Sequence, residues 1–480
     1  MMFRNRRLAY YGIPMLFCLT VHFMGLRTWF YLDDFAWLGL RLEVHSFRDL
    51  LGVLFRPEAQ GTVRTLSERL FFLTFSILFG LNALPFKIWV FLTQFANIAL
   101  LAQITWRITG SALAGFLTAL LWTANPGMAI PLAWVSAYNQ IAFSFFILLA
   151  FRLFLAYIDT GEAKYWVWQW VVFLFGFGSL ELNVVYPVIA AGYALCCART
   201  YLRKTLYLFI PSIAFTAVHF LLISRPDAAS YKMYFGGNLW TALWQYLLFA
   251  LGAVRTSKID WRPLWLGRSV AVAALLLILF FVFRALFRRE YLPLFAFGWF
   301  VVVLFPVLPL KNHFTDYYVT VPAIGLAMLS GWAIASIRGP SIAPACLLVA
   351  VYLAVAITDI HAAQRFYYNK ARKIKHLLTA VTSVQREHPG KTILVEGVDN
   401  DTYWLGFYGD PFRLIGVSRI YLVPGSEKAI DPHPEMGGIS RFMIPPEDLL
   451  PLLRKHDVVV LAFEGSKIRD VTQAYQERLR

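Results

Sequence analysis

Apolar runs of about 20 residues recur along the first 360 residues, and they constrain the fold more than any other feature of this sequence. A helix needs roughly 20 consecutive apolar residues to cross a bilayer. Such runs occupy residues 8–30, 86–106, 110–125, 138–158, 165–180, 184–201, 205–224, 267–287, 291–309, 319–337 and 341–359. Only 15% of the residues are charged, against about 25% in a soluble domain. The sequence therefore predicts an all-α polytopic membrane protein.

Two further apolar stretches, residues 66–83 and 239–254, decide the topology. If neither crosses the bilayer, every inner end carries basic residues, as the positive-inside rule requires. These ends hold Arg4, Arg107, Lys164, Arg203, Arg284 and Arg338. We therefore expect about 11 spans, a retained first span with a cytoplasmic N-terminus, and two helices at the outer interface. The net charge of +16 is understood in this light, because Lys and Arg gather at the cytoplasmic ends of spans. No basic run interleaved with aromatic residues indicates nucleic-acid binding.

The last part of the chain changes character. Residues 361–480 are predicted to form a small extracytoplasmic α/β domain, after a transmembrane domain of residues 1–360. A helical stretch at 362–386 precedes strand-like runs at 392–395, 419–423 and 457–461. This domain shows no glycine-rich phosphate loop and no metal-ligand spacing, and the four cysteines of the chain all lie in apolar runs.

The acidic pair Asp33-Asp34 directly follows the first apolar run. Adjacent carboxylates at a bilayer surface are costly unless they are solvated, paired or functional. A solvated loop end is the ordinary reading of such a pair. The functional reading is a general base whose pKa is tuned by burial and by the neighbouring carboxylate.

Further polar groups are expected at the same outer face. Arg64 could hold a phosphate, Glu181 lies between apolar runs and needs a partner or a cavity, and Trp134 opens an aromatic-polar cluster. The loop between the ninth and tenth spans carries Lys311, Asn312, His313 and Tyr318, which suit phosphate and sugar hydroxyls. Interfacial snorkelling, helix capping and an ordinary polar loop remain the plain alternatives. Together the residues predict a cavity that opens outward.

At these residues the chain resembles polyprenyl-phosphate-sugar-dependent glycosyltransferases of the GT-C fold, and most closely bacterial relatives of the protein O-mannosyltransferases. The matching pieces are Asp33-Asp34, residues 64–67, 78–82, Asn125-Pro126, 134–136, 179–181, 316–318 and 322–327. The sequence departs from the pattern at Leu180, where relatives carry Lys, and at Gln94, where His is expected. These departures affect the expected contacts to the donor phosphate.

The resemblance implies an inverting transfer from a polyprenyl-phosphate-linked sugar to a lipid, glycan or protein acceptor. It assigns Asp33 as base and Asp34 as its helper. It assigns substrate binding to Arg64, Trp134, Glu181, Lys311, Asn312, His313 and Tyr318. Neither a nucleotide nor a bound metal is expected, and the location implied is a bacterial inner membrane. A transporter or lipid flippase, or a degenerate scaffold without activity, are the alternatives; a transporter should carry ionisable residues near mid-span, and few are present.

Overall fold

The computed structural model describes residues 2–58, 61–223, 231–252, 264–288, 290–431, 439–464 and 467–478. The chain forms two compact units. The first comprises Met1–Arg27, Leu54–Phe71 and Leu84–Arg365, and the second comprises Thr28–Val53, Phe72–Ala83 and Phe366–Arg480. The division into domains at 360/361 stays a prediction; the compact units separate at Arg365, within a helix, and the second unit also includes the loop with Asp33 and Asp34.

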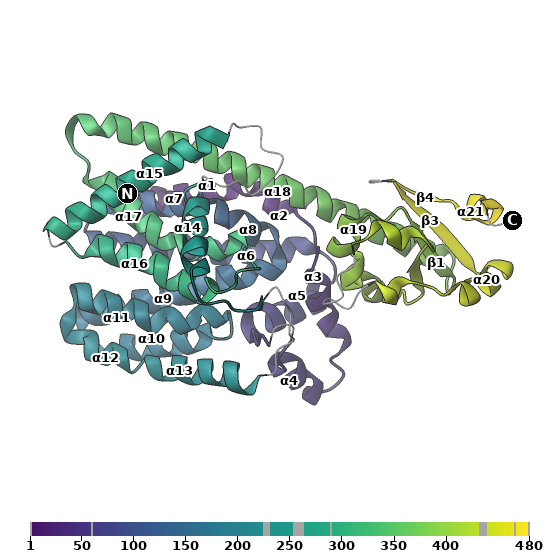
Figure 1. Ribbon diagram of the computed structural model, residues 1–480. Coiled ribbons are helices and arrows are strands. Elements are labelled where there is room, and N and C mark those ends of the chain that lie inside the picture. Colours follow the sequence, from purple (N-terminus) through teal and green to yellow (C-terminus); the bar gives the residue numbers. More distant parts are fainter. Residues whose placement is uncertain are drawn as a thin grey trace. The chain divides into compact units, whose positions relative to one another are not determined.

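The first unit consists of helices and short turns (Figure 1). Its helices are α1 (Met2–Val21), α2 (Phe23–Arg27), α6 (Ala83–Thr109), α7 (Ala112–Thr123), α8 (Ala129–Ala133), α9 (Tyr138–Thr160), α10 (Ala163–Gly176), α11 (Tyr186–Cys197), α12 (Leu202–Leu206), α13 (Phe209–Ala217), α14 (Asn238–Ala250), α15 (Leu264–Arg288), α16 (Leu292–Leu304), α17 (Ala323–Ser336) and the first part of α18 (Ile342–Glu387). Each predicted span overlaps helix, and residue 224, the end of the seventh predicted span, lies outside the described residues. The first span is broken at His22, where α1 ends and α2 begins.

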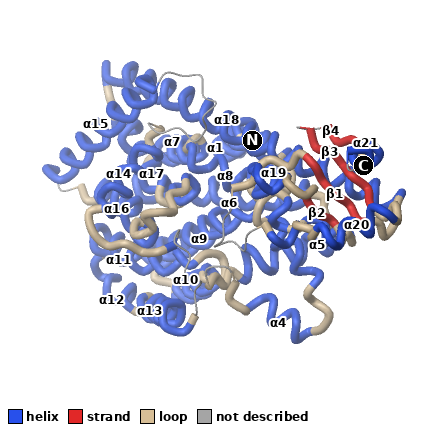
Figure 2. Tube along the Cα trace, turned by 45° about the vertical axis from the view of Figure 1, so that its right-hand side comes forward, coloured by secondary structure: helices blue, strands red, loops and turns tan. Residues whose placement is uncertain are grey.

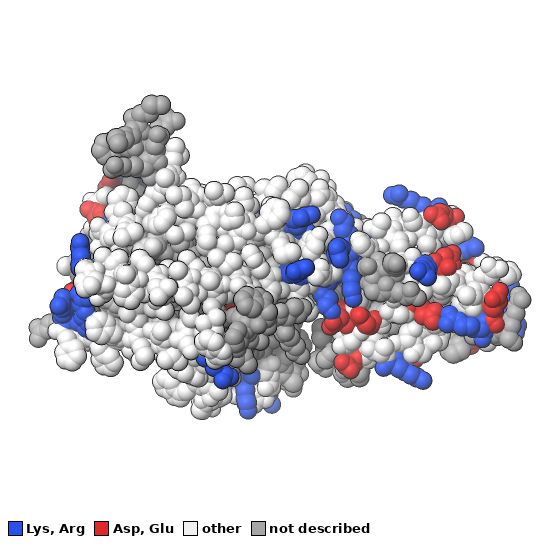
Figure 3. Space-filling view, turned by 90° about the horizontal axis from the view of Figure 1, so that it is seen from above, with Lys and Arg blue, Asp and Glu red and all other residues white. Residues whose placement is uncertain are grey.

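Five helices of the described residues are long and apolar enough to cross a membrane, or six if the bent pair Ala112–Thr123 and Pro126–Ala133 forms one span. The five are Ala83–Thr109, Val135–Thr160, Arg199–Leu222, Trp265–Arg288 and Gly339–Glu387. Shorter apolar helices occupy Leu8–Val21, Glu181–Cys197, Leu292–Val307 and Ala323–Ser336. A broad surface over the helices carries no charged side chain (Figure 3). The protein is therefore an integral membrane protein; the count of 11 spans stays a prediction.

The two stretches expected at the interface both form short helices. The first is a π-helical segment, Thr65–Leu70, continued by α5 (Phe71–Phe79), and the second is α14, of 13 residues. Both are shorter than the roughly 20 residues that a perpendicular crossing needs. Residues 253 and 254, the end of the second predicted stretch, lie outside the described residues.

Small residues let the central helices of the first unit approach closely. A Cβ atom at Gly331 of α17 would overlap Thr118 Oγ1 of α7, and one at Gly325 would overlap the Ala296 carbonyl oxygen of α16. Close contact through small residues drives helix association where lipid removes the hydrophobic gain. Trp122 of α7 adds a hydrogen bond from its indole to Thr320 O, at 2.8 Å. These contacts fix the loop before α17, which carries several of the predicted site residues.

The second unit contains a four-stranded sheet (Figure 2). Its strands are β1 (Thr392–Glu396), β2 (Ile420–Leu422), β3 (Val458–Glu464) and β4 (Lys467–Asp470), in the order β2-β1-β3-β4. Strand β1 pairs in parallel with β2 and β3, while β4 runs antiparallel to β3. The helices of this unit are α3 (Asp34–Gly39), α4 (Phe47–Phe55), α5, the end of α18, α19 (Asn400–Leu405), α20 (Pro446–Arg454) and α21 (Thr472–Arg478). The three predicted strands and the α/β character are confirmed.

Candidate functional site

In the first unit, the turn after α10 is hydrogen-bonded to the segment that carries Arg64. Leu66 N donates to Gly178 O at 2.8 Å, and Ser67 Oγ donates to Ser179 O at 2.6 Å. A Cβ atom at Gly178 would lie 2.8 Å from Leu66 Cγ, so a side chain at this position would require the Leu66 side chain to move. Residues 64–69 and 178–181, far apart in the sequence, therefore form one polar corner.

At this corner, two carboxylates bind the guanidinium group of Arg64. Its Nε donates to both carboxylate oxygens of Glu181, at 3.1 and 3.0 Å, and its Nη1 donates to Glu68 Oε1 at 2.6 Å. Burial acts to lower the pKa of Arg64, but the charges of Glu181 and Glu68 raise it well above its ordinary value. Asn139 Nδ2 donates to the same Glu68 oxygen at 3.1 Å. Among the described residues Glu68 Oε2 and Asn139 Oδ1 are buried without a hydrogen-bond partner.

The charges around Arg64 balance locally. Burial lowers the pKa of Arg69, and the charges of Arg64 and Arg56 lower it further, whereas the charges of Glu68 and Glu58 act to raise it. Arg56 forms an ion pair with Glu58 at 2.6 Å. The corner itself thus holds two arginines, Arg64 and Arg69, and two glutamates, Glu68 and Glu181, and the adjoining Arg56–Glu58 pair is also neutral. An added phosphate would therefore leave the corner negative unless another cation contributes.

The loop before α17 lies within electrostatic range of this corner. Burial raises the pKa of Tyr318 well above its ordinary value, while the charge of Arg64 acts to lower it. The Tyr318 ring centroid lies 5.8 Å from that of His313, whose ring packs on Tyr231 at 4.4 Å. On the other side, Tyr317 contacts Tyr318 at 5.0 Å and Trp134 at 6.1 Å between centroids.

His313 and its neighbours differ in exposure. Burial lowers the pKa of His313, so the imidazole is neutral near pH 7, and its Nε2 is buried without a partner among the described residues. Lys311 and Asn312 are exposed, and Lys311 Nζ lies 5.8 Å from the centroid of the Tyr234 ring. The exposed ammonium group of Lys311 can therefore supply positive charge to a ligand at this loop.

Asp316 follows in the same loop. Burial raises its pKa from 3.8 to about 6, although backbone N–H groups of Tyr317 and Asp316 act to lower it. The predicted residues of the first unit are therefore brought together around one linked set: Glu181, Arg64, Tyr318, His313 and, through Tyr317, Trp134.

The acidic pair lies in the second unit, and its two carboxylates differ. Leu32 has a left-handed backbone (φ 55°), which turns the chain sharply before Asp33. Asp33 is exposed. Asp34 is fully buried at the start of α3, where its Oδ2 accepts from Tyr31 N at 3.1 Å. The structure therefore gives Asp34 a role in holding the turn and leaves the Asp33 side chain at the surface of its unit.

Glu68 and Asn139 were not predicted as site residues. The signal in the sequence was an acidic residue inside the apolar stretch at 66–83, since a carboxylate among apolar residues needs a partner. Its contact with Asn139 could not be read from the sequence, because Asn139 lies 71 residues away. Among the described residues no three His, Cys, Asp or Glu side chains stand as a metal-binding group.

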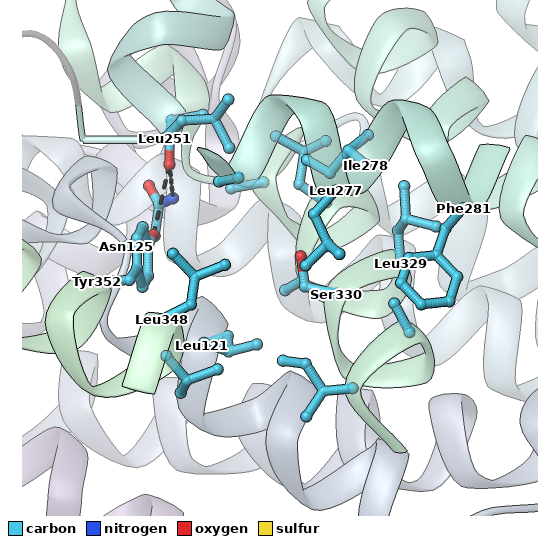
Figure 4. Close-up of a pocket in the computed structure, with 18 of the residues that line it drawn as sticks. Leu121, Asn125, Leu251, Leu277, Ile278, Phe281, Leu329, Ser330, Leu348 and Tyr352 are labelled. Atoms are coloured by element: carbon cyan, nitrogen blue, oxygen red, sulfur yellow. Dashed lines mark hydrogen bonds between the residues drawn. The ribbon is translucent and has the colours of Figure 1, made fainter. Parts of the chain in front are cut away.

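A separate apolar cavity lies among α7, α15, α17 and α18 (Figure 4). Leucine and alanine side chains make most of its wall, with Ser330 and, at one end, Asn125 and Tyr352. Asn125 Nδ2 donates to Ala250 O at 2.9 Å, and Tyr352 donates to the same oxygen at 3.5 Å. None of the residues that line the cavity carries a charge at neutral pH, so it is not the polar site described above.

No protein-family profile and no curated protein sequence matches this chain. Solved structures do. The chain is similar to ArnT from Cupriavidus metallidurans bound to undecaprenyl phosphate, with 10% identity and a TM-score of 0.51 over 95% of this chain and 93% of ArnT. It is also similar to the Archaeoglobus fulgidus oligosaccharyltransferase tethered with an acceptor peptide, with 15% identity and a TM-score of 0.51 over 95% of this chain and 68% of that one. Both have the GT-C glycosyltransferase fold, and this chain has that fold.

Proposed function

We propose that this protein is an inverting membrane glycosyltransferase that moves a sugar from a polyprenyl-phosphate donor to an acceptor outside the cytoplasm. The fold supports this proposal, since both neighbours named above are GT-C glycosyltransferases. The observation that carries it is the contrast between Asp33 and Asp34. One carboxylate is buried to hold a strained turn, and the turn presents the other to solvent.

In the proposed reaction Asp33 acts as base. Its carboxylate takes the proton of an acceptor hydroxyl or amine as that group attacks the anomeric carbon of the donor sugar. The bond from this carbon to the phosphate oxygen breaks on the opposite face, so the configuration inverts. The polyprenyl phosphate leaves as a stable anion and needs no strong general acid, provided that positive charge holds it.

Arg64 and Lys311 are the proposed groups for that anion. The two glutamates occupy Nε and Nη1 of Arg64, which leaves Nη2 without a protein partner among the described residues. Because the corner is already balanced in charge, Lys311 would supply the charge that the phosphate requires. Asn312, Tyr318 and Trp134 are proposed to contact the sugar, and His313 would act as a neutral hydrogen-bonding group. The proposal includes no nucleotide or metal.

We further propose that the donor is a hexose linked to a polyprenyl phosphate and that the acceptor is a lipid, glycan or protein. The bacterial inner membrane is the proposed location, with the N-terminus in the cytoplasm.

The test is sugar transfer by the full chain reconstituted in lipid nanodiscs, with a panel of synthetic polyprenyl-phosphate sugars. Asp33→Asn should lower kcat by about 10²–10⁴-fold, the usual contribution of a general base, with the donor KM little changed. Glu43→Gln, an exposed carboxylate ten residues along the same segment, is the matched control. Equal rates for both variants would remove Asp33 as the base. Movement of intact donor across the bilayer without transfer would favour a flippase.

A further inference from the structure

Residues 404–409 lie against the loop that carries Asp33, within the second unit. Leu32 N donates to Leu405 O at 2.7 Å. A Cβ atom at Gly409 would lie 3.0 Å from Phe35 Cβ and 3.2 Å from Leu32 O. Helix α3 also packs on the 3-10 turn Phe407–Gly409. The C-terminal domain thus forms one wall around the acidic turn and fixes the backbone on both sides of Asp33.

Two aromatic side chains of this wall, Trp404 and Tyr408, are only half-buried. Their ring centroids lie 5.1 Å apart, with planes inclined by 44°. Trp404 Nε1 donates to Asp431 O at 3.2 Å, which fixes the indole orientation. The neighbouring Tyr403, Phe407 and Phe412 rings are fully buried and build the domain core, so Trp404 and Tyr408 are not needed to fill it.

Asp33 and Tyr408 are close enough to interact electrostatically. Burial raises the pKa of the Tyr408 phenol, and the charge of Asp33 raises it further. Tyr408 therefore stays protonated, and its hydroxyl can donate a hydrogen bond to a ligand beside the carboxylate.

A fixed, half-exposed aromatic pair beside an exposed carboxylate suits one ligand chemistry in particular. The C–H face of a pyranose ring is apolar and packs on an aromatic face, while its hydroxyls need hydrogen-bond acceptors and donors at the ring edge. A peptide strand would need unpaired backbone donors and acceptors from a sheet edge. Here the backbone oxygen of Leu405 already accepts a hydrogen bond from Leu32 N.

We infer that Trp404 and Tyr408 form an acceptor site for carbohydrate, which holds a pyranose ring so that one hydroxyl meets Asp33. The inference rests on the proposed function for the role of Asp33, and it names the acceptor class as a glycan or glycolipid. Trp404 and Tyr408 are binding residues in this scheme. Leu32 is a positioning residue, because its left-handed backbone and its bond to Leu405 O direct Asp33.

Carbohydrate binding by Trp404 and Tyr408 can be tested by a measurement that does not depend on sugar transfer. Saturation-transfer NMR on the full chain in nanodiscs would use methyl glycosides of glucose, mannose, galactose and N-acetylglucosamine as probes. We expect saturation to reach the C–H face protons of at least one probe, and Trp404→Ala or Tyr408→Ala to reduce it at least threefold. Tyr421→Phe, a half-buried tyrosine on β2 that packs against the sheet core, is the matched control and should change nothing. No saturation with any probe, or equal saturation in all variants, overturns the inference.

Kinetics separate the inference from the function on which it rests. With a glycan acceptor that the wild type uses, Trp404→Ala should raise the acceptor KM about 3- to 10-fold, the cost of one lost aromatic contact. Trp404→Phe should restore much of the loss, and the donor KM should not move. If the wild type transfers sugar and the acceptor KM is unchanged in Trp404→Ala, the acceptor site is wrong but the proposed function stands. If the wild type transfers no sugar and probe saturation depends on Trp404, the proposed function is wrong but the carbohydrate site stands.

Discussion

Arg64 Nε lies 3.1 and 3.0 Å from the two carboxylate oxygens of Glu181, a residue 117 positions away in the sequence. The pair is partly shielded, with about a fifth of each side chain exposed. Glu68, almost fully buried, binds the same guanidinium from the other side. This geometry makes Arg64 a fixed charge, because two carboxylates hold its orientation before any substrate arrives.

Glu181→Gln should therefore disturb Arg64 more than a surface substitution would. Removing one partner of a shielded ion pair leaves the other desolvated. A double-mutant cycle with Arg64→Gln and Glu181→Gln should give a coupling energy of about 1–3 kcal/mol in thermal stability. The Arg107–Asp159 pair, which is more exposed, is the control, and its cycle should give about 1 kcal/mol or less. Equal coupling energies in the two cycles would show that shielding adds nothing to the Arg64–Glu181 interaction.

Replacement of the two adjacent aspartates should have different effects on the free energy of unfolding. Asp34→Ala removes the acceptor of the Tyr31 N–H in a fully buried turn, so the free energy of unfolding should fall by about 1–3 kcal/mol. Asp33→Ala removes an exposed carboxylate and should change it by no more than about 0.5 kcal/mol. Thermal unfolding of the detergent-solubilised variants measures both. A larger loss for Asp33→Ala would reverse the roles assigned to the pair.

The contrast between Asp33 and Asp34 also marks what the sequence can predict. Apolar runs located the helices and the strands β1, β2 and β3, because burial imposes a local pattern. Strand β4 was missed, since a short polar hairpin strand has no apolar run. The separate predictions of a span at 341–359 and a helix at 362–386 correspond to one continuous helix of 46 residues, α18.

The site was only partly predictable for a different reason. Residue types and their order suggested Arg64, Glu181 and His313, but pairing across more than 100 residues has no local signal. Glu68 went unrecognised for another reason: it lies only four positions from Arg64, but the stretch at 66–83 was expected to form an interfacial helix. The burial of Asp34 depends on the left-handed backbone at Leu32, which leucine seldom adopts and which the sequence therefore did not suggest.

Gly178 should be intolerant of a side chain. A Cβ atom there would meet Leu66 Cγ at 2.8 Å and force apart the two segments that carry Arg64 and Glu181. Gly178→Ala should cost about 1–3 kcal/mol of stability and lower donor affinity. Gly192→Ala, in α11, is the control, because its Cβ would meet no atom within 4 Å. The replacement of glycine in a helix should even stabilise the protein slightly there. Donor binding that is equal in both variants would contradict the proposed link between the corner and the donor.

Asp316 should give the protein a distinct pH dependence. Burial raises its pKa from 3.8 to about 6, so the folded state favours the neutral carboxyl more than the unfolded state does. At pH 7 the charged form costs stability, and this cost should disappear as the pH falls from above 6 toward 4. Asp316→Asn removes the titration. The variant should be more stable than the wild type by about 1–2 kcal/mol at pH 7.5, after allowance for solvent screening. The difference should shrink by about half at pH 5, because the carboxyl of the unfolded chain is still ionised there, as measured by thermal unfolding in matched buffers. Burial lowers the pKa of His313 in both proteins alike, so its contribution largely cancels in the difference. A difference that stays constant from pH 7.5 to pH 5 would mean that Asp316 is solvated in the membrane-embedded protein.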